Sequence, residues 1–200
     1  MEYFVYCRDN PGAAELRERI LEAHWTFMDG YADGMIARGP TMDDARMVAT
    51  GSLHLVDLPD ADAARRFAFE EPNYRAGVYR EVLIRRWRNG LGRTMWEFTG
   101  ARDGYQRFLV IGHGRAGVAR RHAELRDAHR RYFVEGGYED RFIARGALLS
   151  DDGTAWAGSA MLVELPDRGA VDTMLAGEPF ARGELFSEIE VHRWQFGGRS

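Results

Sequence analysis

The 200-residue sequence contains no lysine, and all 27 of its basic residues are arginine. Without lysine the chain cannot form a side-chain Schiff base, which excludes pyridoxal-phosphate enzymes and lysine-dependent aldolases. A P-loop is excluded as well, because that motif needs a lysine after its glycine-rich turn. The net charge of −4 gives no electrostatic reason to expect a nucleic acid or an anionic membrane as a partner.

Cysteine and long apolar runs are also scarce. The single cysteine, Cys7, cannot form an internal disulfide and is typical of a reducing cytoplasm. No apolar run approaches the roughly 20 residues of a membrane span. The N-terminus opens on a strand-like segment with no basic leader, so we expect no signal peptide and a cytoplasmic location. The six histidines lack the spacings of metal-binding motifs, so we expect no metal.

The most informative feature that is present is an internal repeat. Five short motifs of the first half recur in the second half at one shared offset of 107 residues. One matching tetrapeptide would mean little, but five in register indicate a duplication. The period is far longer than that of solenoid or propeller repeats, so each copy is a small domain. The matched pairs are residues 36–39 with 143–146, 51–52 with 158–159, 55–60 with 162–167, 71–72 with 178–179, and 86–87 with 193–194.

Both halves follow the same predicted order of elements, β-α-β-β-α-β, which is the ferredoxin-like plan of an antiparallel sheet with two helices on one face. The other sheet face of each half then needs a cover, and the second copy is the obvious one. The predicted fold class is therefore α+β, with two ferredoxin-like domains packed sheet to sheet as a pseudo-dimeric α+β barrel. The domains are residues 1–90 and 105–200, joined by a glycine-rich linker, 91–104, in which Met95–Phe98 could add an edge strand or a packed arm. The strands are predicted at 2–8, 35–42, 47–58, 80–87, 105–112, 141–149, 156–165 and 185–196, and the helices at 14–31, 60–69, 117–135 and 168–176.

Two histidines occupy matching places in the first helix of each half. His24 lies at the edge of the apolar face of its helix, and the dipeptide Ala23-His24 matches Ala128-His129. One interpretation is a buried histidine that ties helix to sheet, which is the common role of a lone histidine on such a face. The other interpretation is a group that transfers protons.

Further polar candidates lie on the strands beside these helices. Arg38 could hold an anion and Ser52 could point a hydroxyl at a ligand, although a polar turn and close backbone packing explain both equally well. Their counterparts in the second half are Arg145 and Ser159. Asp9, at the end of the first strand, could orient His24, and its position in the second half falls near Gly114.

Taken together, these motifs resemble the YciI-like, or YCII-related, family. The similarity rests on a first strand that ends in an acid (3–9), an Ala-His in the first helix (23–24), an Ala-Arg-Gly-Pro turn (37–40), a Gly-Ser strand (51–52), and an acid-Pro-x-Tyr-x-Ala-Gly-Val-Tyr segment (71–79). It covers both halves. The resemblance implies paired ferredoxin-like sheets, an active site centred on a histidine and an aspartate, and no required cofactor. Halide elimination from an aromatic ring is one chemistry associated with relatives.

Carried over to this sequence, the resemblance makes His24 and Asp9 the catalytic pair and His129 a variant copy. The acid stays open, because the family's usual Asp-Pro after the second helix corresponds to Glu71-Pro72 here. Glu71 and Tyr74 join Arg38 and Ser52 as predicted substrate-binding residues. The second half has alanine in place of the turn proline and lacks the strand-end acid, so we expect any chemistry in the first half.

Two functions remain open at this point. The first is cofactor-independent acid–base catalysis on a small aromatic or anionic molecule, with His24 as the proton shuttle. The second is a non-catalytic protein that binds a small molecule or is purely structural. Because each chain carries its own partner domain, we expect a monomer or a weak homodimer.

Overall fold

The computed structural model describes residues 1–45 and 47–199 and divides the chain into two compact units. Unit 1 comprises residues 1–88 together with the C-terminal residues from Arg193, and unit 2 comprises residues 89–192. The segment 91–104 thus belongs to unit 2, and the end of the chain returns to unit 1. The last residue of the predicted second domain, Ser200, lies outside the described residues. None of the described helices is long and apolar enough to span a membrane.

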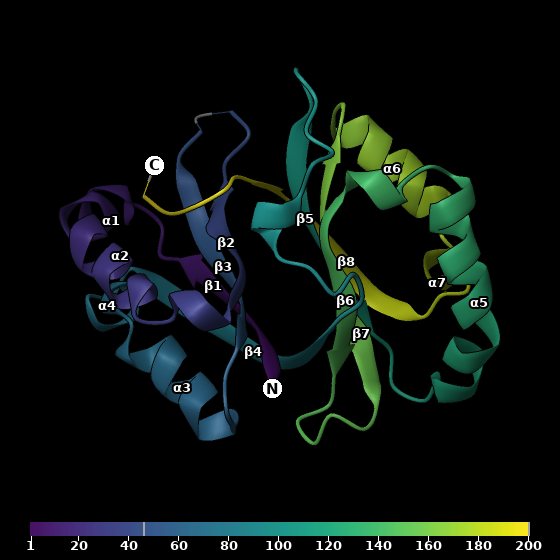
Figure 1. The fold of residues 1–200 in the computed structure, drawn as a ribbon, viewed down its shortest axis with the longest axis horizontal. Coiled ribbons are helices and arrows are strands. Elements are labelled where there is room, and N and C mark those ends of the chain that lie inside the picture. Colours follow the sequence, from purple (N-terminus) through teal and green to yellow (C-terminus); the bar gives the residue numbers. More distant parts are fainter. Residues whose placement is uncertain (46, 200) are drawn as a thin grey trace. The chain divides into compact units, whose positions relative to one another are not determined.

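Unit 1 contains the predicted β-α-β-β-α-β order (Figure 1). One difference is that the helix predicted over 14–31 is divided at Ile20, whose backbone leaves the helical region (φ −110°, ψ 9°). A single-turn helix also follows the third helix, where the sequence indicated only a turn. The elements are β1 (Glu2–Asp9), α1 (Ala14–Arg19), α2 (Leu21–Asp29), η1 (Ala32–Gly34), β2 (Met35–Met42), β3 (Ala49–Asp57), α3 (Ala61–Glu70), α4 (Pro72–Arg75) and β4 (Tyr79–Asn89).

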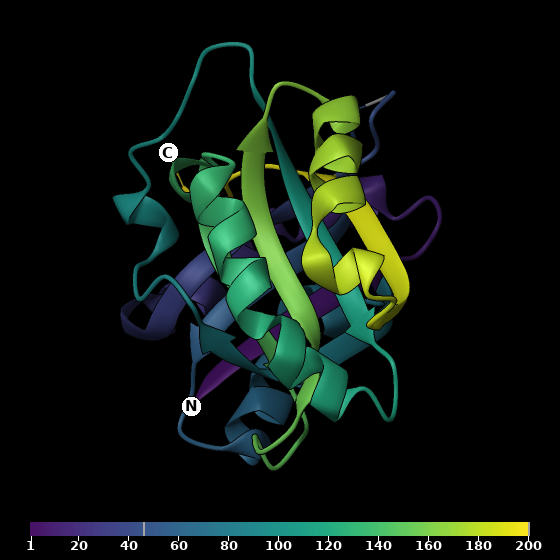
Figure 2. The same cartoon turned by 90° about the vertical axis from the view of Figure 1, so that its right-hand side faces the viewer.

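Unit 2 repeats this order, and its helices α5 and α6 lie side by side over one face of its sheet (Figure 2). The edge strand considered for Met95–Phe98 is wrong, because a 3-10 helix with a Thr94 capping box forms there instead. The elements are η2 (Met95–Glu97), β5 (Gln106–Gly114), α5 (Ala119–Glu135), η3 (Glu139–Arg141), β6 (Phe142–Leu149), β7 (Trp156–Leu165), α6 (Arg168–Gly177), α7 (Pro179–Arg182) and β8 (Phe186–Trp194).

The strand pairing confirms the predicted fold class. In unit 1, β1 pairs antiparallel with both β3 and β4, and β2 pairs with β3. In unit 2, β7 pairs in the same way with β5 and β6. The strand order β1-β3-β2-β8-β5-β7-β6-β4 is that of a closed barrel.

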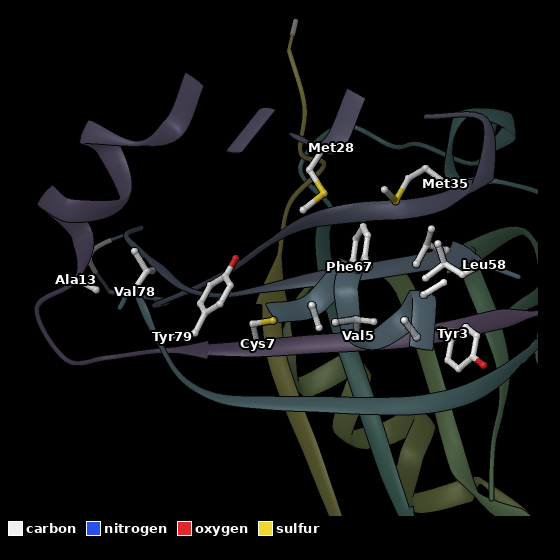
Figure 3. Close-up of a cluster of buried hydrophobic side chains, with 14 residues drawn as sticks. Tyr3, Val5, Cys7, Ala13, Met28, Met35, Leu58, Phe67, Val78 and Tyr79 are labelled. Atoms are coloured by element: carbon white, nitrogen blue, oxygen red, sulfur yellow. The ribbon is translucent and has the colours of Figure 1, made fainter. Parts of the chain in front are cut away.

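The core of unit 1 lies between its sheet and its helices. Val5, Met28 and Phe67 are completely or almost completely buried there, and Figure 3 shows them converging from β1, α2 and α3. Asp60, the first residue of the helix predicted at 60–69, caps α3, since its side chain accepts a hydrogen bond from Ala63 N at 2.7 Å. Burial of these apolar faces fixes α2 against β3, and this packing determines where the polar side chains of both elements meet.

The C-terminal segment joins unit 1 along β2. Trp194 pairs with Thr41, Gln195 N donates to Pro40 O at 3.1 Å, and Gly197 N donates to Arg38 O at 3.0 Å. Glycine is required at Gly39 by this close approach, because a Cβ there would lie 1.9 Å from Gln195 O. The residues after β8 are thereby held beside Arg38.

Candidate functional site

His24 is held by a buried carboxylate from the start of α4. Glu71 caps that helix, and it accepts hydrogen bonds from Asn73 N at 3.0 Å and Tyr74 N at 3.1 Å. Its Oε1 lies 2.5 Å from His24 Nδ1. The acid against His24 is therefore Glu71, and the alternative pairing with Asp9 is wrong.

The environment of Glu71 determines the tautomer of the histidine. An ionised carboxylate only accepts hydrogen bonds, so Nδ1 of His24 carries a hydrogen, and in the neutral imidazole Nε2 is then the nitrogen with the lone pair. Asn73 Nδ2 also lies 3.0 Å from Nδ1, but the carboxylate at 2.5 Å is the stronger partner. His24 is thus arranged as a base whose free nitrogen is Nε2.

Asp9 has a different partner, Arg17 on α1. The guanidinium makes two hydrogen bonds to this carboxylate, of 3.0 Å from Nε and 2.6 Å from Nη2. Its Nη1 donates to Ser52 Oγ at 3.0 Å. Burial raises the pKa of Asp9, and the hydrogen bonds from Arg17 oppose that rise. The role of Asp9 is therefore to anchor an arginine beside Ser52.

A cavity of about 230 Å³ in unit 1 brings together three of the predicted site residues, His24, Arg38 and Ser52. Glu71, Tyr74 and Asp9 lie outside it, and Tyr74 packs its ring against Phe69 instead. Among residues 1–45 and 47–199, the lining contains two arginines and no carboxylate. Its polar side chains are Arg17, His24, Arg38, Ser52 and His54, and its larger apolar ones are Leu21, Trp25, Met28, Pro40 and Phe196.

His54 is a cavity residue that the sequence analysis missed. It lies on β3 directly opposite Arg38 in the β2–β3 register, and only 3 % of its surface is exposed. Its ring lies 5.9 Å from that of His24 and packs edge-on against Phe67. Among the described residues its Nδ1 has no hydrogen-bond partner. Leaving such a buried atom unsatisfied costs about 1–3 kcal/mol unless a ligand or water meets it.

The histidine–carboxylate pair is repeated in unit 2. His129 Nδ1 lies 2.5 Å from Glu178 Oε1, and Glu178 caps α7 through Phe180 N and Ala181 N. Both halves therefore keep the same pair, and the absence of a strand-end acid does not distinguish them. The second half has Gly114 at the strand-end position, as the sequence indicated, and Glu178 is the carboxylate beside its histidine.

The register of the two sheets shows which residues are equivalent. Ser52 pairs with Cys7, just as Ser159 pairs with Gly112. Asp9 therefore corresponds to Gly114, as the repeat suggested. Continuing this alignment along the chain matches further residues of the two halves. The pairs are Arg17 with His122, Ala49 with Trp156, His54 with Met161, Asn73 with Phe180 and Tyr79 with Phe186.

In unit 2, aromatic rings occupy the positions that surround the cavity of unit 1. Trp156 stacks on His122 with a centroid distance of 4.6 Å, and Phe180 stacks on His129 at 4.0 Å. Phe186 contacts both Trp156 and Phe180. The histidine that is equivalent to His24 is thus covered by a ring on its face.

Arg145, the counterpart of Arg38, also has different contacts. Arg145 donates to Glu139 at 2.8 Å and lies over the rings of Phe133 and Phe142. In unit 1, the distance from Arg38 to the nearest oxygen of Asp29 is 3.8 Å. Arg38 lines the cavity and pairs with Asp29 at its edge, whereas Arg145 lies within a packed cluster. Within the described residues, no group of three or more His, Cys, Asp or Glu side chains is placed to hold a metal.

The burial of His54 predicts acid sensitivity. Desolvation, and then the neighbouring charges of His24, Arg17 and Arg38, lower its pKa well below the usual value. Below a pH of about 6.5 the unfolded chain protonates this imidazole while the folded chain does not, so stability is lost as the pH falls. We expect His54→Met to reduce that loss by up to about 1.4 kcal/mol per pH unit between pH 6.5 and 5.

Urea denaturation of both chains at several pH values checks this prediction. The remaining histidines are common to both chains, so their contributions cancel in the difference. Parallel pH profiles for the wild type and His54→Met would contradict it. Methionine is the matched replacement, because Met161 occupies the equivalent position in unit 2.

Comparisons with known proteins identify a family and a fold. A family model for the YCII-related domain matches residues 1–88 and again 106–195. A mutant chlorite dismutase from Candidatus Nitrospira defluvii is 8% identical with a TM-score of 0.61, and the match covers 97% of this chain and 91% of that one. A protein described as a monooxygenase from Lactobacillus acidophilus NCFM is 9% identical with a TM-score of 0.53, covering 97% and 92%. At these identities the likeness shows the fold alone.

One half of the chain also matches a shorter protein. This is 5-chloro-2-hydroxyhydroquinone dehydrochlorinase from Burkholderia phenoliruptrix AC1100, solved with 2,5-dihydroxybenzoquinone. The identity is 23% and the TM-score is 0.44, and the match covers 46% of this chain and 99% of that one. No curated protein matches the chain.

Proposed function

Because the chain belongs to the YCII-related domain family, whose domain it carries twice, we propose that unit 1 performs cofactor-independent acid–base chemistry on a small aromatic or anionic molecule. One observation carries this proposal: the cavity of unit 1 is lined by an oriented histidine, two arginines and a serine. Pockets for drug-sized molecules span about 300–1,000 Å³. A cavity of about 230 Å³ therefore suits a smaller molecule, of about one ring.

Each polar residue of the cavity has a role in this proposal. Glu71 fixes the tautomer of His24, and Nε2 of His24 takes a proton from the ligand and returns it. Arg38 binds the anionic group of the ligand. Ser52, held by Arg17, offers a hydroxyl to the same molecule. Asp9 acts only through Arg17, as a positioning residue.

In the same proposal, the second half supports the fold and not the chemistry. Its His129–Glu178 pair ties α5 to the start of α7 beside a partly buried aromatic cluster. The alternative function, a protein that binds a small molecule without converting it, uses the same cavity. Turnover of a bound ligand is what separates the two functions.

Replacing each histidine separately tests the proposal. A ligand is first found by thermal-shift screening of small aromatic and anionic molecules. We expect His24→Ala to lower turnover of that ligand about a hundredfold, the usual contribution of a general acid or base. We expect His129→Ala to leave turnover unchanged.

Stability provides the control for these two variants. Both replacements remove the partner of a buried carboxylate, so both should lower the free energy of unfolding by a similar amount, about 1–3 kcal/mol. Equal loss of turnover in the two variants, or a loss only in His129→Ala, would contradict the assignment to unit 1. Binding without turnover in the wild type would favour the non-catalytic alternative.

A further inference from the structure

The two halves of this chain serve as an internal control for what a ligand needs. The histidine–carboxylate pair is present in both, including the half in which rings cover the histidine. That pair is therefore part of the shared architecture and is not the feature that makes unit 1 a binding site. The features that differ are the residues that face the cavity.

Among these residues, His54 differs from its counterpart in its ability to form hydrogen bonds. It is almost completely buried, its Nδ1 has no partner among the described residues, and its counterpart Met161 cannot donate a hydrogen bond. His54 lines the cavity, and a buried polar side chain there that lacks a partner is complementary to a hydrogen-bonding group on a ligand. In unit 2 a thioether fills the same position.

The neighbours of His54 indicate the rest of the ligand. Arg38 is its direct cross-strand partner, so both side chains lie on one face of the β2–β3 ladder. Ser52 lies on the same face, two residues along β3. A guanidinium, a hydroxyl and an imidazole are thus neighbours, which suits a ligand with an anionic group beside a second polar group.

Charge and shape narrow the ligand class further. No carboxylate lines the cavity in the described part of the chain, whereas Arg17 and Arg38 both do. The apolar wall includes the aromatic side chains of Trp25 and Phe196, and aromatic side chains favour contact with a planar ring. The cavity volume suits one ring.

We propose that the cavity of unit 1 binds a one-ring aromatic carboxylate bearing a ring hydroxyl, with the carboxylate on Arg38 and the hydroxyl on the imidazole of His54. His54 is then the residue that selects the hydroxylated ligand, and His24 lies beside it as the base. This inference rests on the proposed function and adds to it the ligand class and a specificity residue.

The test compares benzoate with 2-, 3- and 4-hydroxybenzoate by isothermal titration calorimetry. With the wild-type chain we expect one hydroxybenzoate to bind at least tenfold more tightly than benzoate. In His54→Met we expect that preference to disappear while the affinity for benzoate is retained. In His54→Gln, whose amide can still form a hydrogen bond, we expect part of the preference to return.

Each outcome decides one point. A preference that survives in a folded His54→Met chain would overturn the role of His54. If that variant fails to fold, the same result in His54→Leu, whose side chain cannot form a hydrogen bond, would do so. Failure of the wild type to bind any of the four acids would overturn the ligand class. The proposed function is judged separately, because it rests on the difference between His24→Ala and His129→Ala with any ligand found by screening.

Discussion

Replacing Ala49 with tryptophan should abolish ligand binding to unit 1 while the chain still folds. Ala49 lines the cavity, and its counterpart Trp156 stacks on His122, the counterpart of Arg17. An indole at residue 49 can stack on the guanidinium of Arg17 in the same way and fill the cavity. We expect affinity to fall by more than a thousandfold, to below detection in calorimetry.

The reciprocal change provides the matched control. Trp156→Ala removes the same ring from unit 2, so it should lower stability through lost packing but leave ligand affinity unchanged. Circular dichroism and a cooperative thermal transition would show that Ala49→Trp remains folded. Undiminished affinity in folded Ala49→Trp would mean that the ligand binds elsewhere in the chain.

The second large effect concerns the buried ion pair of Asp9 and Arg17. We expect Arg17→Met to lower the free energy of unfolding by about 3–5 kcal/mol, because it leaves a buried carboxylate without its partner. Only 9 % of the surface of Asp9 is exposed, and both guanidinium contacts to it are lost. Urea denaturation at pH 7 measures the loss.

A double variant separates the pair from the packing around it. Asp9→Asn removes the charge that Arg17→Met strands, so the combined variant should be more stable than Arg17→Met alone. The deficit of Arg17→Met should also shrink at low pH, because protonation neutralises a carboxylate whose pKa burial already raises. Strictly additive losses in the double variant would show that the two side chains do not stabilise each other.

The fold could be predicted from the sequence because its signals are local and occur twice. Alternating strands, apolar helix faces and the cap at Asp60 each specify an element within a few residues, and the repeat confirms each assignment a second time. The break at Ile20 could not be predicted, since the apolar spacing continues through it. The 3-10 turn at Met95 was missed because a segment with three apolar residues in four, Met95–Phe98, is equally compatible with a strand.

The site was predictable only in part, because hydrogen-bond partners depend on tertiary geometry. The sequence singled out His24, Arg38 and Ser52, and the structure brings them to one cavity. The sequence could not show which of two acids contacts His24, since Asp9 lies at the end of a strand and Glu71 lies at the start of a helix. His54 carried a usable signal that was overlooked: the two halves differ there, with methionine at the equivalent position.

The central claim is that unit 1 holds the functional site and that the aromatic cluster of unit 2 closes the equivalent one. The most direct measurement is a crystal structure of the chain grown with a ligand found by thermal-shift screening. We predict ligand density against Arg38, Ser52 and His54. Density against His129 and Trp156 instead, with the cavity of unit 1 free of ligand, would contradict the claim.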